Sequence, residues 1–169
     1  GPRIREALAE AWRIGREARI PVEVWHLKLS GRPYWGRMPE ILAAFDSVRA
    51  TGVQAWANSY PYVASANDLA SIIPPWAHAG GKDSLLARLR DPATRARIRE
   101  GMVGPRADAS ASEAGGLGGI LILSVLDTSL RRYQGRRLTD LAQAEGKDPY
   151  EFLFDLLIAD GANAGRATF

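Results

Sequence analysis

The sequence contains no cysteine and only two histidines, and this scarcity limits the chemistry that the chain can carry out by itself. Without cysteine, the chain can form neither a disulfide framework nor a thiolate metal site. Catalytic zinc sites use about three protein ligands, so a single histidine cannot hold zinc firmly. The chain alone therefore does not supply a complete metal-dependent active site.

Two further features are missing. No apolar run approaches the ~18 residues that a membrane span requires, and no signal peptide is visible, so we expect a cytoplasmic protein without a membrane partner. Lys and Arg outnumber Asp and Glu by 22 to 19, but the arginines are spread along the expected helices. This distribution does not indicate a nucleic-acid partner. The chain opens within a helical pattern and stops without a polar tail, so we expect both ends to be cut from a longer protein.

The first third of the sequence alternates between helix and strand patterns. Apolar residues at three-to-four-residue spacing predict an amphipathic helix over residues 3–18, and an apolar run predicts a strand over 20–27. A second helix begins near Pro39 and ends before Gly52, and a second strand follows over 53–57. Ile41, Leu42, Phe45 and Val48 are expected to form the buried face of the second helix. Such alternation with short connections implies an α/β fold with a parallel sheet.

From residue 66 the alternation stops. We expect a short helix over 67–73, helices over 83–90 and 92–100, and a Gly- and Ser-rich mobile loop over 101–119. A strand over 119–125 and a short helix over 139–145 follow, and Asp148 is placed to cap a last helix. This part of the chain is therefore predicted to be mostly helical.

Candidate site residues follow both expected strands. If residues 20–27 extend as a strand, His26 and Lys28 point to the same side of its C-terminal end, where an imidazole can bind a metal and an ammonium an anion. Tyr60 follows the second strand, and Pro61 holds it in extended geometry. The alternative interpretation is a buried histidine, a surface lysine and a half-buried tyrosine.

Several motifs resemble, in order along nearly the whole chain, those of the N-acyl-D-amino-acid deacylases (D-aminoacylases) of the metal-dependent amidohydrolase superfamily. The similar motifs are His26-Leu27-Lys28 with Gly31-Arg32 and Trp35-Gly36-Arg37, Tyr60-Pro61-Tyr62 with Ala64-Ser65, Pro74-Pro75-Trp76 with Gly80-Gly81, Leu85-Leu86-Ala87-Arg88-Leu89 with Asp91-Pro92-Ala93-Thr94-Arg95, and Gly135-Arg136-Arg137-Leu138 with Gly146-Lys147-Asp148-Pro149. Each motif alone is weak, but the combination is specific.

The resemblance implies a (β/α)8 TIM-type barrel with a mostly helical insertion. Residues 1–65 would form part of the barrel, 66–146 the insertion beside the barrel mouth, and 147–169 a helix and strand that return to the barrel. The implied reaction is zinc-dependent hydrolysis of the amide bond of N-acyl-D-amino acids. His26 would be a metal ligand, Lys28 and Tyr60 would bind the carboxylate of this small-molecule substrate, and no residue of the chain would act as the proton shuttle.

Two alternatives stay open: an amidohydrolase that acts on another linear amide or a D-peptide, and an inactive barrel fragment with a structural or binding role. The sequence departs from the family at Asn58, where Asp is frequent, and at Ala66, where a substrate-contacting Ser is common. The family's other metal ligands, and the aspartate that moves protons, have no counterpart here. His78 is expected to be a surface or lid residue, and Trp35 and Trp76 suit either an apolar pocket or ordinary packing.

Overall fold

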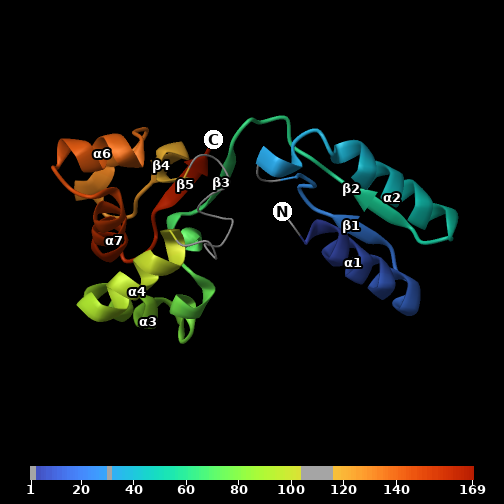
Figure 1. Ribbon diagram of the computed structural model, residues 1–169, viewed down its shortest axis with the longest axis horizontal. Coiled ribbons are helices and arrows are strands. Elements are labelled where there is room, and N and C mark those ends of the chain that lie inside the picture. The colour runs from blue at the N-terminus through green and yellow to red at the C-terminus, as the bar shows by residue number, and fades with distance from the viewer. Residues whose placement is uncertain (1–2, 30–31, 104–115) are drawn as a thin grey trace. The chain divides into compact units, whose positions relative to one another are not determined.

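A computed structural model describes residues 3–29, 32–103 and 116–169 of the chain. The chain divides into two compact units, Gly1–Tyr62 and Val63–Phe169, each with a hydrophobic core of its own. Figure 1 shows the first unit in blue to teal and the second in green to red. Each unit is described by itself.

The first unit alternates helices and strands as the sequence predicts. Helix α1 (Ile4–Ala18) precedes strand β1 (Val22–Val24), and helix α2 (Met38–Ala50) precedes strand β2 (Ala55–Ala57), with a 3-10 turn at Arg32–Tyr34 (Figure 1). The two strands pair in parallel, with Val22 opposite Ala55 and Val24 opposite Ala57. The predicted parallel pairing is confirmed, but β1 is shorter than the expected strand over 20–27.

Both helices of the first unit contribute to one core. Its buried members are Leu8, Leu27, Ile41, Phe45, Val48, Val53 and Ala55. The ring of Trp12 on α1 meets Phe45 on α2 edge to face, with 5.2 Å between ring centroids. The expectation that Leu42 is buried was wrong, because this residue of α2 is 52% exposed.

The second unit combines a three-stranded sheet with helices. The elements, in chain order, are β3 (Ser65–Asp68), 3-10 turns at Leu69–Ile72 and Pro75–His78, α3 (Gly81–Arg90), α4 (Pro92–Val103), a 3-10 turn at Gly116–Gly119, β4 (Ile120–Ser124), a 3-10 turn at Thr128–Tyr133, α6 (Leu138–Ala144), α7 (Pro149–Ala159) and β5 (Gly165–Thr168). The sheet has the order β3-β5-β4, and both pairings are antiparallel. Ser65 at the start of β3 lies opposite Thr168 at the end of β5.

Several predictions for the second unit are confirmed and one is wrong. The helices α3, α4, α6 and α7 and the strand β4 lie close to their expected ranges, and the Asp148 carboxylate caps α7 by accepting hydrogen bonds from the N–H groups of Tyr150 and Glu151. The helix expected over 67–73 is instead the end of β3 followed by a 3-10 turn, because β5 supplies a strand partner for Ser65–Asp68. The loop expected over 101–119 lies mostly outside the described residues, and its two ends belong to α4 and to the Gly116–Gly119 turn.

The division of the chain bears on the expected domain limits. Residues 147–169, which form α7 and β5, lie in the same compact unit as the whole expected insertion over 66–146. The structure therefore describes an α/β fold, and the role of each unit in a complete barrel stays a prediction.

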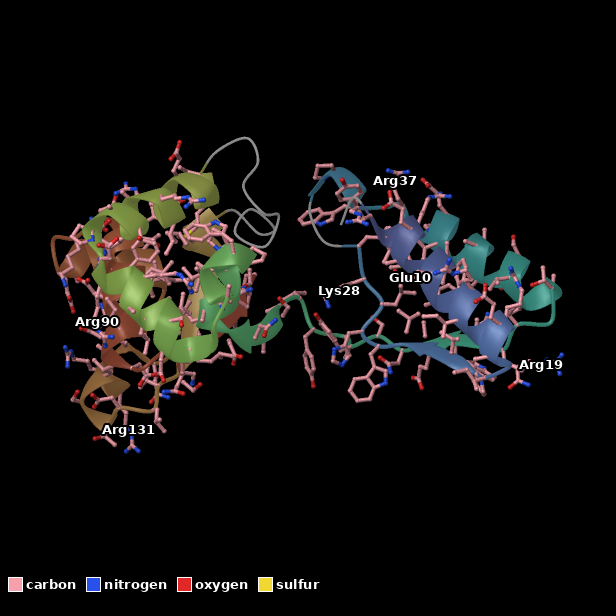
Figure 2. All side chains as sticks on the ribbon, turned by 90° about the horizontal axis from the view of Figure 1, so that it is seen from below. Glu10, Arg19, Lys28, Arg37, Arg90 and Arg131 are labelled. Carbon is pink, nitrogen blue, oxygen red and sulfur yellow. The ribbon has the colours of Figure 1, made fainter. Side chains whose placement is uncertain are left out.

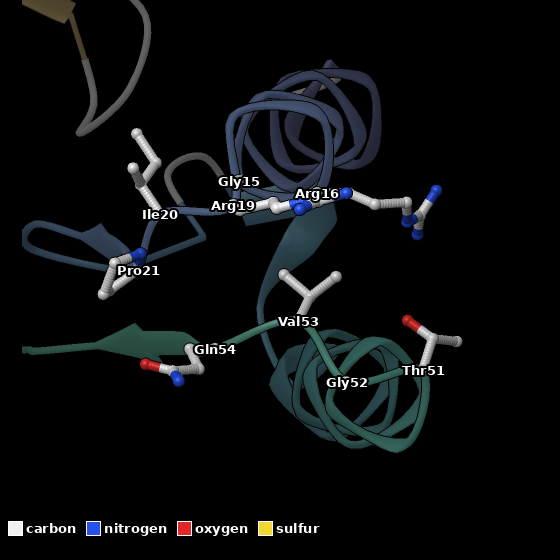
Figure 3. A pocket seen from close by; sticks show the side chains of 9 residues that line it. All are labelled: Gly15, Arg16, Arg19, Ile20, Pro21, Thr51, Gly52, Val53 and Gln54. Carbon is white, nitrogen blue, oxygen red and sulfur yellow. The ribbon is translucent and has the colours of Figure 1, made fainter.

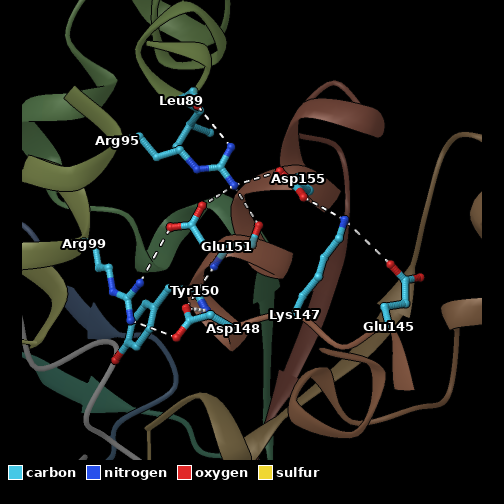
Figure 4. A network of polar contacts seen from close by, with 9 residues as sticks. All are labelled: Leu89, Arg95, Arg99, Glu145, Lys147, Asp148, Tyr150, Glu151 and Asp155. Carbon is cyan, nitrogen blue, oxygen red and sulfur yellow. Dashed lines mark hydrogen bonds and ion pairs between the residues drawn. The ribbon is translucent and has the colours of Figure 1, made fainter. Parts of the chain in front are cut away.

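A polar network ties α4 to α7 in the second unit (Figure 4). Nη2 of Arg95 lies 2.8 Å from Oε2 of Glu151 and 2.7 Å from Oδ1 of Asp155, and it also donates to the Glu151 carbonyl at 2.9 Å. The guanidinium lies 5.2 Å from the ring centroid of Phe154. Arg95 is thus the most enclosed cation of the network, with only 17% of its side chain exposed.

Candidate functional site

The candidate site begins where β1 ends. Trp25 and His26 form a turn directly after Val24, and His26 adopts a left-handed backbone conformation with φ of 54°. The expectation that His26 and Lys28 lie on an extended strand was therefore wrong. The apolar run suggested an uninterrupted strand, but the turn at His26 ends β1 after three residues.

The turn nevertheless gathers the residues that the sequence singled out. The rings of His26 and Tyr60 meet edge to face with 5.3 Å between centroids. Nζ of Lys28, on the coil that leaves β1 (Figure 2), lies 5.2 Å from the centroid of the Tyr60 ring and donates to the His26 carbonyl at 3.4 Å. The structure thus brings the three residues together at the C-terminal ends of the two parallel strands, and their roles stay predictions.

The charge and hydrogen bonding of the group leave it open to a ligand. Lys28 makes no ion pair with any residue that the structure describes, and its side chain is exposed. The imidazole nitrogens of His26 make no hydrogen bond within the same described ranges, so both are available. An ammonium and a free imidazole on one surface suit an anionic ligand beside a metal ion.

Aromatic side chains flank this group on both sides. The ring of Trp25 lies 5.5 Å from that of His26, and the ring of Tyr62 stacks on Tyr60 with 6.2 Å between centroids. Trp25 and Tyr62 are 73% and 76% exposed. Sequence reasoning assigned no role to either residue, although Trp25 adjoins His26 and Tyr62 belongs to the Tyr60-Pro61-Tyr62 motif, and it considered Trp35 and Trp76 for an apolar pocket instead.

Trp76 and His78 lie in the second unit, in the 3-10 turn Pro75–His78. Arg97 stacks over the Trp76 ring at 4.5 Å from its centroid, which is ordinary packing between helix and turn. Nε2 of His78 lies 3.3 Å from the Ile73 carbonyl oxygen. His78 therefore has a local structural partner. Trp35 is 65% exposed in the first unit.

The described residues do not include a complete metal site. Within residues 3–29, 32–103 and 116–169, no three side chains of the His, Cys, Asp or Glu type are clustered so that they could hold a metal ion. The carboxylate of Glu23 is near the turn, but it accepts a hydrogen bond of 2.8 Å from the side-chain amide of Asn58. His26 is thus a candidate for one ligand of a larger set.

A cavity of about 280 Å³ lies at the opposite end of the two parallel strands (Figure 3). It is lined by the C-terminal ends of the two helices and by the residues that lead into the strands, including Arg16, Arg19, Pro21 and Gln54. Ligands of parallel α/β folds bind at the carboxyl ends of the strands, so this cavity is not at the expected place for chemistry.

The described part of the chain contains no helix that is both long and apolar enough to cross a membrane.

Comparison with known proteins shows that the chain is similar to D-aminoacylases. No protein-family profile matches it. Over 69 residues, which make up 41% of this chain, it is 39% identical to a D-aminoacylase of Alcaligenes xylosoxydans xylosoxydans. A D-aminoacylase crystal structure, described for its binuclear metal centre, matches 99% of the chain with a TM-score of 0.59 and 26% identity. The N-acyl-D-glutamate deacylase of Bordetella bronchiseptica, solved with zinc and a phosphonate inhibitor, matches the same share with a TM-score of 0.61 and 22% identity, and supports the fold alone.

These likenesses define the chain first as an α/β segment with the fold of part of a D-aminoacylase. More particularly, its sequence is similar to that of D-aminoacylase, as its motifs suggest. The chain spans 14% of the curated relative and about 25% of each of these solved structures.

Proposed function

We propose that this chain is one segment of a zinc-dependent N-acyl-D-amino-acid deacylase with a (β/α)8 barrel. The reaction would hydrolyse the amide bond of the substrate and release a carboxylate and a free D-amino acid. The observation that carries the proposal is the convergence of His26, Lys28 and Tyr60 at the carboxyl ends of two parallel strands, in a chain similar in sequence to D-aminoacylase. Chemistry in such barrels takes place at this end of the strands.

The residues present fit the roles that this function assigns. The imidazole of His26 is free of hydrogen bonds to described residues and would contribute one zinc ligand. Bound zinc polarises a carbonyl group and lowers the pKa of a water molecule. Lys28, as a point charge, and Tyr60, through its phenolic O–H, would bind the substrate carboxylate and so fix the amide bond in place.

The remaining ligands and the proton-transfer group would come from parts of the enzyme outside this chain. The ligand count supports this: about three protein ligands are needed, whereas the chain offers His26 and has no cysteine. An apolar acyl group would lie on the exposed rings of Trp25 and Tyr62, which flank the three residues.

The test compares the 169-residue chain with a full-length protein that carries it. Free amine released from an N-acetyl-D-amino acid is measured with added zinc, and bound metal is measured in both preparations. We expect turnover and stoichiometric zinc in the full-length protein and neither in the short chain. His26→Ala should remove both from the full-length protein.

His78→Ala is the matched control, because His78 is the other histidine and its partner is the Ile73 carbonyl. It should leave turnover and zinc unchanged. Turnover by the short chain that is lost on His78→Ala would show that the active site lies elsewhere. A full-length protein that folds and binds zinc but releases no amine would favour a structural or binding role.

A further inference from the structure

His26 has an unusual backbone for a residue at the end of a strand. Its φ of 54° lies in the left-handed region, which costs a residue with a side chain free energy. The other described non-glycine residues with positive φ are Arg19 and Ala162, and both follow the end of a helix, where this conformation is common. A strained backbone at a candidate site needs a partner that holds it, and it points to a functional constraint.

The partner is Asn58, which lies 32 residues further along the chain. Its Oδ1 accepts a hydrogen bond of 2.8 Å from the backbone N–H of His26. Its own backbone flanks the same turn, because its N–H donates to the Val24 carbonyl at 3.2 Å and its carbonyl accepts from the Leu27 N–H at 2.8 Å. Asn58 therefore contacts the turn before, at and after His26.

Glu23 fixes the orientation of the Asn58 amide. Nδ2 of Asn58 donates to Oε1 of Glu23 at 2.8 Å. A backbone N–H can only donate and an ionised carboxylate can only accept, so the amide of Asn58 fits between His26 and Glu23 in one orientation only. Glu23 lies on β1 and Asn58 directly after β2, so the parallel pairing of the strands sets the distance between them.

We infer that Asn58 is a positioning residue that holds the backbone of His26 for metal binding, and that Glu23 keeps Asn58 in its working orientation. This inference rests on the proposed function, because it assigns His26 to a metal. Asn58 touches neither metal nor substrate in this scheme and acts through His26. Partners outside the ligand shell of a metal site typically change its affinity 10- to 100-fold when they are removed.

The variants differ in which hydrogen bonds of Asn58 they keep, so the ranking of their effects tests each bond separately. Asn58→Ala removes both hydrogen bonds. Asn58→Asp keeps the acceptor for His26 but places a second carboxylate against Glu23, and the double variant Asn58→Asp with Glu23→Gln restores a donor between them. Glu23→Gln alone keeps an acceptor for Asn58. Asn67→Ala is the matched control, since Asn67 is an exposed asparagine in the second unit whose Oδ1 accepts from the neighbouring Asp68 N–H.

Two readouts are measured. The first is hydrogen exchange of the His26 amide in the 169-residue chain, which should become roughly fivefold to tenfold faster in Asn58→Ala. The second is the zinc dissociation constant of the full-length protein, which should rise about 10- to 100-fold in Asn58→Ala and Asn58→Asp. The double variant should return both the exchange rate of the His26 amide and the zinc dissociation constant most of the way to the parent values. Glu23→Gln and Asn67→Ala should match the parent in both measurements.

An unchanged exchange rate of the His26 amide in Asn58→Ala would overturn the inference, because the turn would then be held by something else. So would faster exchange with unchanged zinc affinity, provided that His26→Ala still weakens zinc. If His26→Ala itself leaves zinc binding intact, the proposed function is wrong and the assigned purpose of Asn58 is wrong with it. Circular dichroism of each variant separates these results from unfolding.

Discussion

Arg95 and Arg99 provide a direct test of how burial determines the contribution of an ion pair to the free energy of unfolding. They lie one helical turn apart on α4, and both contact Glu151 on α7 (Figure 4). The Arg95 side chain is 17% exposed, whereas that of Arg99 is 41% exposed. The comparison keeps the helix and the charge constant, and each arginine also pairs with a second carboxylate, Asp155 for Arg95 and Asp148 for Arg99.

Replacement of Arg95 by Ala removes two short charge-assisted contacts, at 2.8 and 2.7 Å, and a hydrogen bond to a backbone carbonyl. Each hydrogen bond to a charged group contributes about 1.5–3 kcal/mol. The carboxylates of Glu151 and Asp155 are 41% exposed and regain water, which reduces the sum. We therefore expect Arg95→Ala to lower the free energy of unfolding of the second unit by about 2–3 kcal/mol, and Arg99→Ala by about 0.2–1 kcal/mol.

Hydrogen exchange of the α7 amides under increasing urea reports on the second unit alone and measures both values. The pH dependence adds a second check. Burial raises the pKa of Asp155, but hydrogen bonds from Lys147 and Arg95 outweigh it and hold that pKa below its usual value of 3.8. A carboxyl with a lowered folded-state pKa stabilises the fold above its unfolded pKa and loses this effect as the pH falls. The difference in free energy of unfolding between the parent and Arg95→Ala should thus become smaller below pH 3.8. The reasoning would be refuted if Arg95→Ala and Arg99→Ala lowered the free energy of unfolding equally, or if the difference between the parent and Arg95→Ala did not depend on pH.

Three further predictions concern the first unit. Gly15→Ala should lower its free energy of unfolding by about 1–3 kcal/mol in urea titrations, because the added Cβ would lie 2.5 Å from Cγ2 of Val22; a neutral result would mean that α1 shifts freely on the sheet. Hydrogen bonds from Arg37, and secondly from Arg5, lower the pKa of Glu40 to about 2. The Glu40 carboxyl should therefore titrate near that pH by NMR, and its pKa should move toward 4.5 in Arg37→Gln. The same pKa in the parent and in Arg37→Gln would show that this exposed pair does not form in solution. Lys28→Met should raise KM of the full-length enzyme for an N-acyl-D-amino acid about 10- to 100-fold while KM for an N-acyl amine without a carboxylate stays constant; equal changes for both substrates would exclude a carboxylate contact.

The alternation of the first unit was predictable because its signals are local. The helix periodicity before β1, Pro39 within the first turn of α2 and Gly52 with φ of 87° after it each depend on neighbours in the sequence. The same holds for the cap at Asp148, whose partners are within three residues. Local rules for helices and caps therefore gave most of the elements.

The errors arose where partners are distant in sequence. His26 leaves the extended conformation in a turn tied to Asn58 across 32 residues, and no local pattern around His26 indicates that bond. Ser65–Asp68 contains residues with low strand propensity, yet it forms β3 because β5, about a hundred residues later, provides its pairing. The gathering of His26, Lys28 and Tyr60 was expected from parallel strands, but the contact that shapes it was visible only in three dimensions.

The pairing of Ser65 with Thr168 has a consequence for protein engineering. Opposed residues of antiparallel strands lie about 4.5–5.5 Å apart, so Ser65 and Thr168, at the two ends of the second unit's sheet strands, are neighbours in space. A segment with adjacent ends can be spliced into a surface turn of an unrelated host without stretching it, and can be removed and replaced by a short loop at little entropic cost. Residues 65–168 are therefore suited to transfer as one segment from this chain to an unrelated host protein.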